Sequence, residues 1–75
     1  MAKAYVLIET AVGRTREVVE ALSKISGITS VDMVTGPYDI ITVIEKEKLA
    51  DIGDLVTGKI HTVSGISRTV TCLVV

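Results

Sequence analysis

The chain has 75 residues, which is enough for one domain and too few for two. Eight basic and nine acidic residues give a net charge of −1, so the chain lacks the excess of positive charge typical of proteins that bind nucleic acid directly. A single Cys excludes an intrachain disulfide and a paired-thiol zinc or copper site.

Hydrophobic residues make up 48% of the chain, and with no Trp or Phe they are mainly small aliphatic residues. No apolar run approaches the roughly 20 residues that span a bilayer, and Glu9 interrupts the apolar segment at the N-terminus. We therefore expect a cytoplasmic protein without membrane contact, and we expect no metal and no cofactor.

The first half of the chain predicts a strand, a helix and a second strand. Residues 3–10 are apolar on both faces, as in a buried strand. Residues 14–26 change to a helical period, with an apolar stripe opposite a charged face. Gly27 is expected to be the C-cap glycine of this helix, and residues 28–35 are expected to form the second strand.

A Gly-Pro turn signal then separates the second strand from a third at residues 39–44. Two β-forming runs on either side of such a turn predict an antiparallel hairpin. Pro37 fixes its own φ, and Gly36 accepts a backbone angle that larger residues resist. The loop should hold a tyrosine and a carboxylate, Tyr38 and Asp39, at one end of a sheet.

The second half repeats the first. Residues 45–61 have a helical period, although Gly53 and Gly58 inside it each cost about 1 kcal/mol relative to Ala. Residues 67–75 predict the last strand. The order βαββαβ predicts an α+β, ferredoxin-like fold, with a four-stranded antiparallel sheet and two helices on one face.

Both faces of this predicted sheet are apolar, but the helices cover only one of them. Burying one aliphatic side chain contributes about 1.5–3 kcal/mol to stability, so leaving this whole face in water would be costly. The exposed apolar patch would also be larger than the patches that monomeric proteins usually expose. We therefore expect the chain to oligomerise through the other face, most simply with a second copy. The predicted sets are Tyr5, Leu7, Ile41, Val43, Leu73 and Val75 on one face, and Ala4, Val6, Ile8, Ile40, Ile44, Val70 and Val74 on the other.

Several short motifs occur in a characteristic order. Gly13 opens the first helix, a Gly-Ile pair leads into the second strand, Thr35-Gly36-x-x-Asp39 precedes an apolar strand, and Gly65-Ile66 precedes Thr69-x-Thr71. In this order and spacing, the chain resembles the ligand-binding (RAM) domain of the leucine-responsive regulatory protein/asparagine regulator (Lrp/AsnC) family. The resemblance covers residues 1–75 as a single domain.

Family regulators also carry a DNA-binding helix-turn-helix, whereas this sequence begins at the first strand of the effector domain. It therefore resembles a stand-alone version, and direct binding to nucleic acid is not expected. The resemblance implies a homodimer formed through the sheet, assembly of dimers into a ring such as an octamer, and a free amino acid bound between dimers. It implies a ligand site lined by Gly36, Tyr38, Asp39, Thr69 and Thr71.

Each of these five residues also has a purely structural interpretation. Asp39 pairs with a ligand ammonium group or only caps its turn. Gly36 and the loop N–H groups receive a ligand carboxylate or make an ordinary turn. Tyr38 contacts a ligand or a neighbouring subunit, or has no partner. Thr69 and Thr71 offer hydroxyl groups to a ligand, or are present as good strand formers.

The leading hypothesis is an amino-acid-binding and oligomerisation module. It would regulate amino-acid metabolism or transcription by associating with itself or with full-length Lrp/AsnC regulators. The alternative is a small dimeric ferredoxin-like enzyme of the monooxygenase or isomerase type, and a third possibility is an amino-acid-sensing ACT domain. Enzymes need converging acid and base groups, whereas this chain has one His and no clustered carboxylates, so we expect no catalysis.

Overall fold

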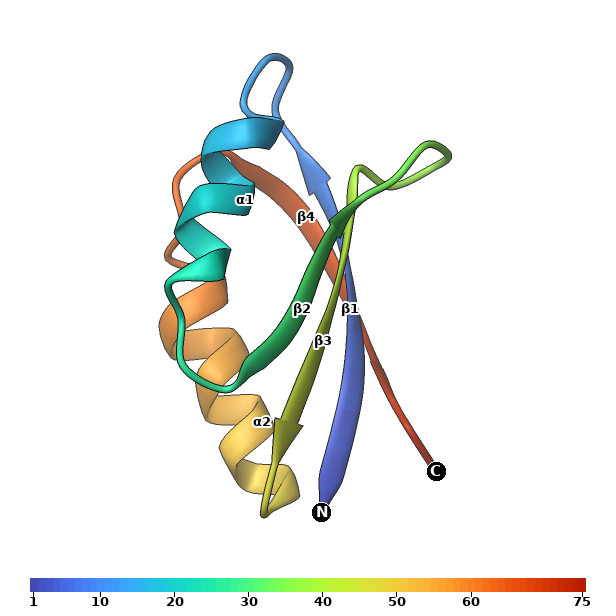
Figure 1. Ribbon diagram of the computed structural model, residues 1–75, viewed down its shortest axis with the longest axis vertical. Coiled ribbons are helices and arrows are strands. Elements are labelled where there is room, and N and C mark those ends of the chain that lie inside the picture. The colour runs from blue at the N-terminus through green and yellow to red at the C-terminus, as the bar shows by residue number, and fades with distance from the viewer.

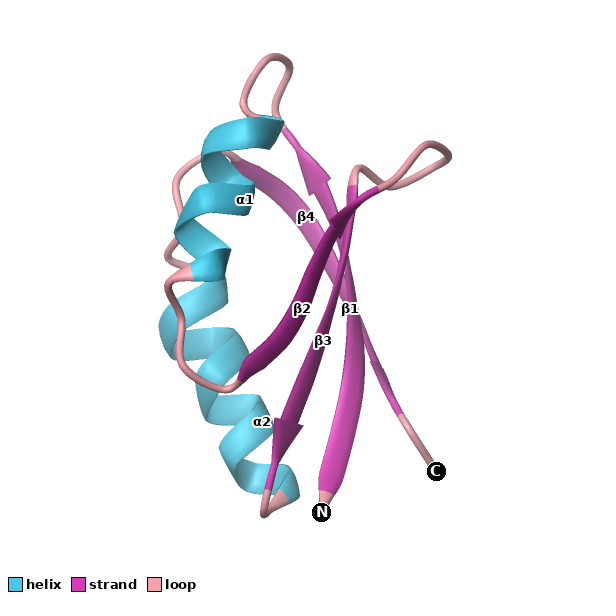
Figure 2. Ribbon diagram, viewed as in Figure 1, coloured by secondary structure: helices cyan, strands magenta, loops and turns pink.

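The structure, a computed structural model, describes all 75 residues and confirms the order βαββαβ. The strands form one antiparallel sheet in the order β2-β3-β1-β4, and both helices lie on the same face of it (Figures 1 and 2). This is the predicted ferredoxin-like arrangement. The bounds are β1 Ala2–Thr10, α1 Thr15–Ser23, β2 Ile28–Met33, β3 Ile40–Lys46, α2 Leu49–Leu55, η1 Val56–Ile60 and β4 Ile66–Leu73.

The core lies between the helices and the two central strands, β1 and β3. Alternate residues of these strands point to the helices, and these residues are paired across the sheet. The buried core has 11 apolar members, and only 12 of the 75 residues are buried in all, so the core is small even for a short domain. Its members are Ala4, Val6, Ile8, Val18, Leu22, Ile40, Ile44, Ile52, Leu55, Val56 and Ile60.

The first helix is shorter than predicted. It ends at Ser23, and the N–H of Lys24 caps the carbonyl groups of the last turn. Gly27 is therefore not the C-cap. It lies in the turn that leads into β2, with a φ of +98° that favours glycine. The start of α1 is fastened by Arg14, whose guanidinium donates to Glu17 and to Ser64 Oγ. The hydrogen bond to the Glu17 carboxylate, with its charge, raises the pKa of Arg14.

The second helix also differs from the prediction of residues 45–61. It begins at Leu49, because β3 continues to Lys46 and its last residues pair with the start of β1. After Leu55 the helix widens into the π-helical segment η1, where the N–H of His61 donates to the carbonyl of Val56 at 2.9 Å. No helix of the chain is long and apolar enough to cross a membrane.

The strands depart from the predicted bounds by one or two residues. The hairpin between β2 and β3 is present, but β2 stops at Met33 and β3 starts at Ile40, which leaves a six-residue connection. Within the hairpin, Thr42 is the one buried polar residue, and its hydroxyl donates to the carbonyl of Ser30. The last strand covers Ile66–Leu73 and not residues 67–75.

The register of β4 corrects the predicted sets of residues on the two faces. Val70 lies opposite Leu7, and Leu73 lies opposite Ala4. Directly paired residues share a face, so Val70 lies on the face without helices and Leu73 on the helix face, the reverse of the prediction. The prediction was wrong because alternation shows which residues of one strand share a face. It does not show the register with the neighbouring strand, which decides which of the two faces that is.

Candidate functional site

The sheet face opposite the helices is uncovered (Figure 1), and strand pairing gives it an apolar centre. We call it the outer face. Strand pairing places six apolar side chains on three adjacent strands of it, and Tyr5 and Val70 remain 40% and 36% exposed. Polar side chains from all four strands border it. The apolar centre is Tyr5, Leu7, Ile41, Val43, Val70 and Cys72, and the border includes Lys3, Glu9, Ser30, Asp32, Glu45 and Arg68.

Asp39 joins the loop after β2 to the end of β1. Its carboxylate Oδ2 accepts hydrogen bonds from the N–H of Thr10 at 2.8 Å and from the hydroxyl of Thr10 at 3.2 Å. Its own N–H donates to the carbonyl of Ile8 at 2.9 Å. The Thr10 hydroxyl is also 2.7 Å from that of Thr15, so the bond network extends to α1. Asp39 thus holds three segments together, a wider role than capping its own turn.

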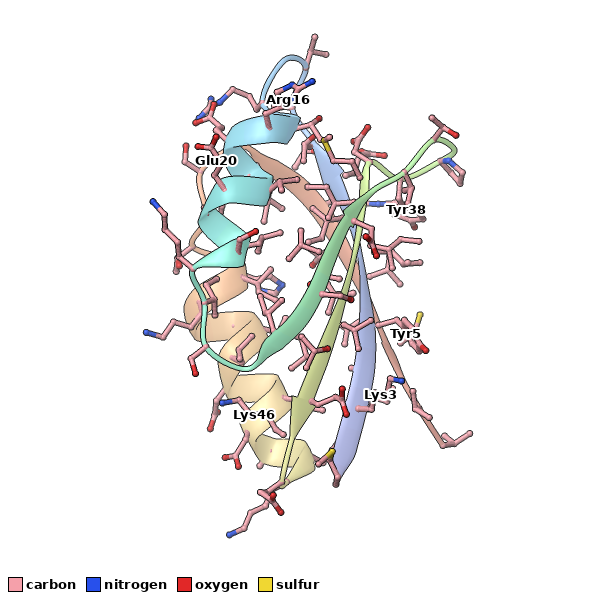
Figure 3. All side chains as sticks on the ribbon, viewed as in Figure 1. Lys3, Tyr5, Arg16, Glu20, Tyr38 and Lys46 are labelled. Atoms are coloured by element: carbon pink, nitrogen blue, oxygen red, sulfur yellow. The ribbon has the colours of Figure 1, made fainter.

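Tyr38 lies at the border of the outer face, on the side of the sheet away from the helices (Figure 3). Its hydroxyl accepts a hydrogen bond from Arg68 at 2.8 Å, and the guanidinium carbon of Arg68 lies 5.5 Å from the ring centroid, within the range of a cation–π contact. Arg68 pairs with Glu9 across the strands. Tyr38 is therefore held against β4 across the end of β1, and it is not a free loop tyrosine.

Gly36 is exposed at the tip of the same loop. Its φ is +139°, and a Cβ added there would meet no atom within 4 Å. The position therefore favours glycine for its backbone angle and not for a close contact within the chain. Its N–H and carbonyl groups make no backbone hydrogen bond in the turn, so they remain free for water or for a partner.

Thr69 and Thr71 lie on the same face of β4, and this is the helix face because they pair with Ile8 and Val6. The Thr69 hydroxyl is 3.0 Å from Nε2 of His61, and this contact links β4 to the end of η1. Thr71 is exposed and lines a mainly apolar groove of about 320 Å³ between β4 and α2.

The five predicted residues do not converge within one chain. Tyr38 contacts the outer face, whereas the two threonines lie on the helix face. Of the three cavities in the chain, one contains Thr71, and none contains Gly36, Tyr38, Asp39 or Thr69. No group of three or more His, Cys, Asp and Glu side chains is placed to hold a metal ion. A ligand that touches all five residues would need surfaces from more than one copy.

Three partners of these residues were not anticipated from the sequence: Thr10 for Asp39, Arg68 for Tyr38 and His61 for Thr69. The first two pairs are 29 and 30 residues apart along the chain and are brought together by the strand order of the sheet, whereas His61 and Thr69 are 8 residues apart, across the turn between η1 and β4. The one sequence signal for them is that Thr10 and Arg68 each stand at the end of a predicted strand.

Comparison with protein families finds one match over nearly the whole chain. The model of the Lrp/AsnC ligand binding domain matches residues 3–75. Among curated proteins, the uncharacterized HTH-type transcriptional regulator PH1916 of Pyrococcus horikoshii is 32% identical over 56 residues. This alignment covers 75% of the present chain and 37% of PH1916, so the chain spans little more than a third of the regulator's length.

Solved structures match over the full chain. FFRP-DM1 is 33% identical with a TM-score of 0.94, and all of both chains is covered. TTHA0845 from Thermus thermophilus is 32% identical with a TM-score of 0.94, and the match covers 100% of the present chain and 94% of TTHA0845. The regulator NMB0573 of Neisseria meningitidis, solved in complex with L-Met, has a TM-score of 0.87 at 14% identity and is covered over 49% of its length, which shows a common fold alone.

Proposed function

Because the chain belongs to the Lrp/AsnC ligand-binding domain family, we propose that it is a cytoplasmic, non-catalytic module that binds a free amino acid and assembles with copies of itself. Its role is to regulate amino-acid metabolism or transcription through this assembly, or by joining full-length regulators of the same family. The observation that carries the proposal is the uncovered apolar outer face on a chain of this family.

The outer face supports assembly on energetic grounds. Full burial of one Leu, Ile or Val side chain contributes about 1.5–3 kcal/mol, and six apolar side chains lie together at the centre of this face. A polar border around an apolar centre is the usual composition of a protein interface. A second copy placed face to face on a two-fold axis covers both apolar centres at once, because such an interface uses the same surface on each copy.

The placement of the five predicted ligand residues supports a site that only an assembly completes. Gly36 offers free backbone groups, Tyr38 and Asp39 stand on the same loop, and Thr69 and Thr71 lie on β4. In our proposal the amino acid binds where the loop of one copy meets the helix face of another. Asp39 then receives the ammonium group of the ligand with Oδ1, the oxygen that Thr10 leaves free.

Native mass spectrometry with and without a panel of the 20 amino acids tests both halves of the proposal. We expect a dimer or a larger even-numbered assembly, and binding of at least one amino acid with a matching rise in the thermal midpoint. An assembly that no amino acid binds or stabilises would refute the sensing role. Addition of a full-length relative in the same experiment tests for mixed assemblies.

The enzymatic alternative has no specific observation in its favour. Asp39 and His61 are the natural candidates for acid–base work, yet each is hydrogen-bonded to a threonine, and no cavity contains either of them.

A further inference from the structure

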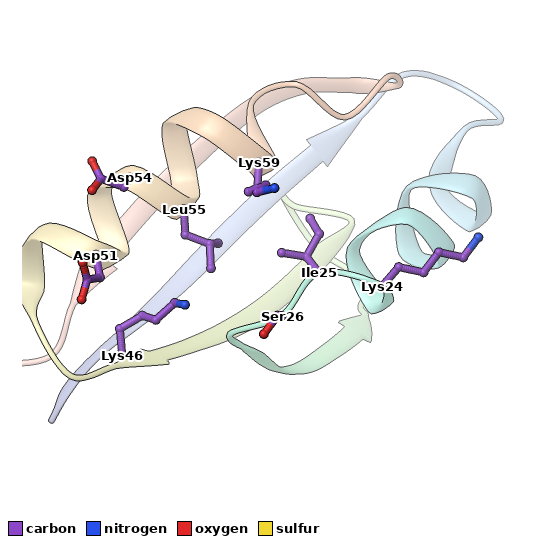
Figure 4. Close-up of a pocket in the computed structure, with 8 residues that line it drawn as sticks. All are labelled: Lys24, Ile25, Ser26, Lys46, Asp51, Asp54, Leu55 and Lys59. Atoms are coloured by element: carbon purple, nitrogen blue, oxygen red, sulfur yellow. The ribbon is translucent and has the colours of Figure 1, made fainter.

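A polar cleft opens on the helix side of the molecule, between the end of α1, the end of β3 and the α2–η1 segment (Figure 4). It encloses about 590 Å³, within the range of small-molecule sites. None of the residues of the proposed amino-acid site lines it, and it is formed within one chain. Its lining residues are Lys24, Ile25, Ser26, Lys46, Asp51, Asp54, Leu55 and Lys59.

Lys46 enters this cleft from the end of β3. It is half-buried, on the helix face at the end of β3, and its ammonium group points into the cleft between Ser26 and Leu55 (Figure 4). Gly27 makes room for it. A Cβ at Gly27 would lie 2.6 Å from Cε and 3.0 Å from Nζ of Lys46, and 2.8 Å from Cδ1 of Leu55. The aliphatic part of Lys46 thus lies directly against the backbone of a glycine.

The ammonium group of Lys46 has no partner within the chain. Its Nζ makes no hydrogen bond, and the sole ion pair of the molecule joins Arg14 to Glu17. No fully buried side-chain nitrogen lacks a partner, so Nζ remains accessible to a ligand. A hydrogen bond from an ammonium group to an anion is charge-assisted and about twice as strong as one between neutral groups, so this group can hold an anion that enters the cleft.

The surroundings of Lys46 favour an anion with a short apolar part. Lys59 brings a second positive charge from η1, and Ile25 and Leu55 provide apolar contact on the inner side of the cleft. Among the other charged residues, Lys24 and Asp54 extend away from the centre (Figure 4). The carboxylate on the Lys46 side of the cleft is therefore that of Asp51, and the distance between Asp51 and Lys46 is too long for an ion pair.

We infer that this cleft binds a small organic monoanion, whose carboxylate group contacts the Lys46 ammonium and whose apolar part lies on Ile25 and Leu55. The inference goes beyond the proposed function, because the cleft shares no residue with the proposed amino-acid site and needs no second copy. It gives the otherwise unpartnered ammonium group a partner.

The direct test is an NMR titration of the intact ¹⁵N-labelled chain with butyrate, and separately with inorganic phosphate, against sodium chloride at equal ionic strength. We expect saturable shifts in residues 24–27, 46 and 51–59 with butyrate, and weaker binding of acetate, which has less apolar surface. Inorganic phosphate has no apolar part and should bind more weakly than butyrate, and tighter binding of phosphate would overturn the assignment of an organic carboxylate. Shifts that match the chloride control, or that never saturate, would overturn the inference.

Variants make the test specific. Lys46→Met keeps the aliphatic stem and should weaken butyrate binding about tenfold, the loss expected for one charge-assisted hydrogen bond. Lys48→Met is the matched control, because Lys48 is exposed just before α2 and does not line the cleft, and it should bind as the unmodified chain does. Equal binding by both variants would contradict the assignment of Lys46.

Asp51→Asn distinguishes a simple anion from a zwitterion. For a simple anion, removal of this nearby negative charge should strengthen butyrate binding roughly twofold, as expected for a solvent-screened charge, while Asp54→Asn should change it less. Weaker binding in Asp51→Asn would overturn the monoanion assignment. None of these substitutions lies on the outer face or in the proposed amino-acid site. If the predicted changes in butyrate binding are not observed, the proposals for assembly and amino-acid binding are therefore unaffected.

Discussion

At the scale of single residues, Gly27 connects the backbone to the polar cleft. Its φ of +98° is costly for any residue with a side chain, and the space where a Cβ would lie is filled by Lys46 and Leu55. Both the turn into β2 and the position of Lys46 therefore depend on the same absent side chain.

Gly27→Ala should lower the free energy of unfolding by about 2 kcal/mol, because it combines backbone strain with a clash against the core side chain of Leu55, whereas the flexible end of Lys46 can move aside. Gly13→Ala is the matched control. Its φ is also positive, at +78°, but no atom lies within 4 Å of the new Cβ, so strain alone should cost about 1 kcal/mol. Urea unfolding at one fixed protomer concentration measures both, and equal losses would mean that the clash contributes nothing.

Asp39 has a structural role through Thr10 and a ligand role in the proposal, and two substitutions separate them. Asp39→Ala leaves the half-buried N–H of Thr10 without its acceptor and should cost about 1–2 kcal/mol of stability. Asp39→Asn keeps an oxygen in that place, so it should stay close to the unmodified chain in stability and still lose most amino-acid binding, since the negative charge is gone. Thermal unfolding and calorimetry measure the two effects, and full amino-acid binding by Asp39→Asn would contradict the proposed ammonium contact.

The sequence predicted Tyr38 and Asp39 as paired features of one loop, but it did not predict what they bind. Their partners Arg68 and Thr10 come from β4 and β1, and only the strand register brings them there. A residue type and a turn are local properties, whereas a hydrogen-bond partner about 30 residues away is a property of the sheet.

At the scale of elements, the α2–η1 segment shows where periodicity is informative and where it fails. The apolar spacing predicted one buried side made of Leu49, Ile52, Val56, Ile60 and Val63. Ile52, Val56 and Ile60 do lie in the core, but Leu49 is exposed, and the core residue Leu55 was not in the predicted set. The spacing did not reveal the π-helical turn, because apolar residues spaced three and four apart fit an α-helix and also a helix with one wider, π-helical turn. The hydroxyl of Thr57 also bonds back to the carbonyl of Gly53 within this segment.

Gly53→Ala should raise the free energy of unfolding by about 0.5–1 kcal/mol. Gly53 lies inside α2 with an ordinary helical φ, it is exposed, and a Cβ there meets no atom within 4 Å. Alanine therefore gains helix propensity without a clash. Urea unfolding checks the result, and a loss of stability would show that the groove beside Gly53 must stay open.

At the scale of the whole molecule, the fold was accessible from the sequence because strand and helix periods alternate clearly and Gly residues mark the turns. The apolar character of both sheet faces was also visible in the alternation. The assignment of Val70 and Leu73 to their faces was not, because it depends on how β4 aligns with β1. The proposed ligand residues are the least predictable part, since they lie on both sides of the sheet and do not converge within one chain.

Val43→Lys should dissociate the assembly, because it places a charge at the centre of the outer face, where it would be buried against a second copy without a partner. Val12→Lys makes the same chemical change at a fully exposed loop tip away from this face, and it should leave the assembly intact. Analytical ultracentrifugation of both variants, with circular dichroism to verify folding, gives the comparison. Dissociation by both variants, or by neither, would count against the outer face as the interface.

The measurement that tests the central claim most directly is the mass of the unmodified chain in solution across a dilution series, determined by light scattering and sedimentation velocity at neutral pH. The apolar outer face predicts a species of at least twice the protomer mass that persists to low micromolar concentration. A well-folded species of single-protomer mass throughout the series would contradict the claim, because the outer face would then be stable in water without a second copy.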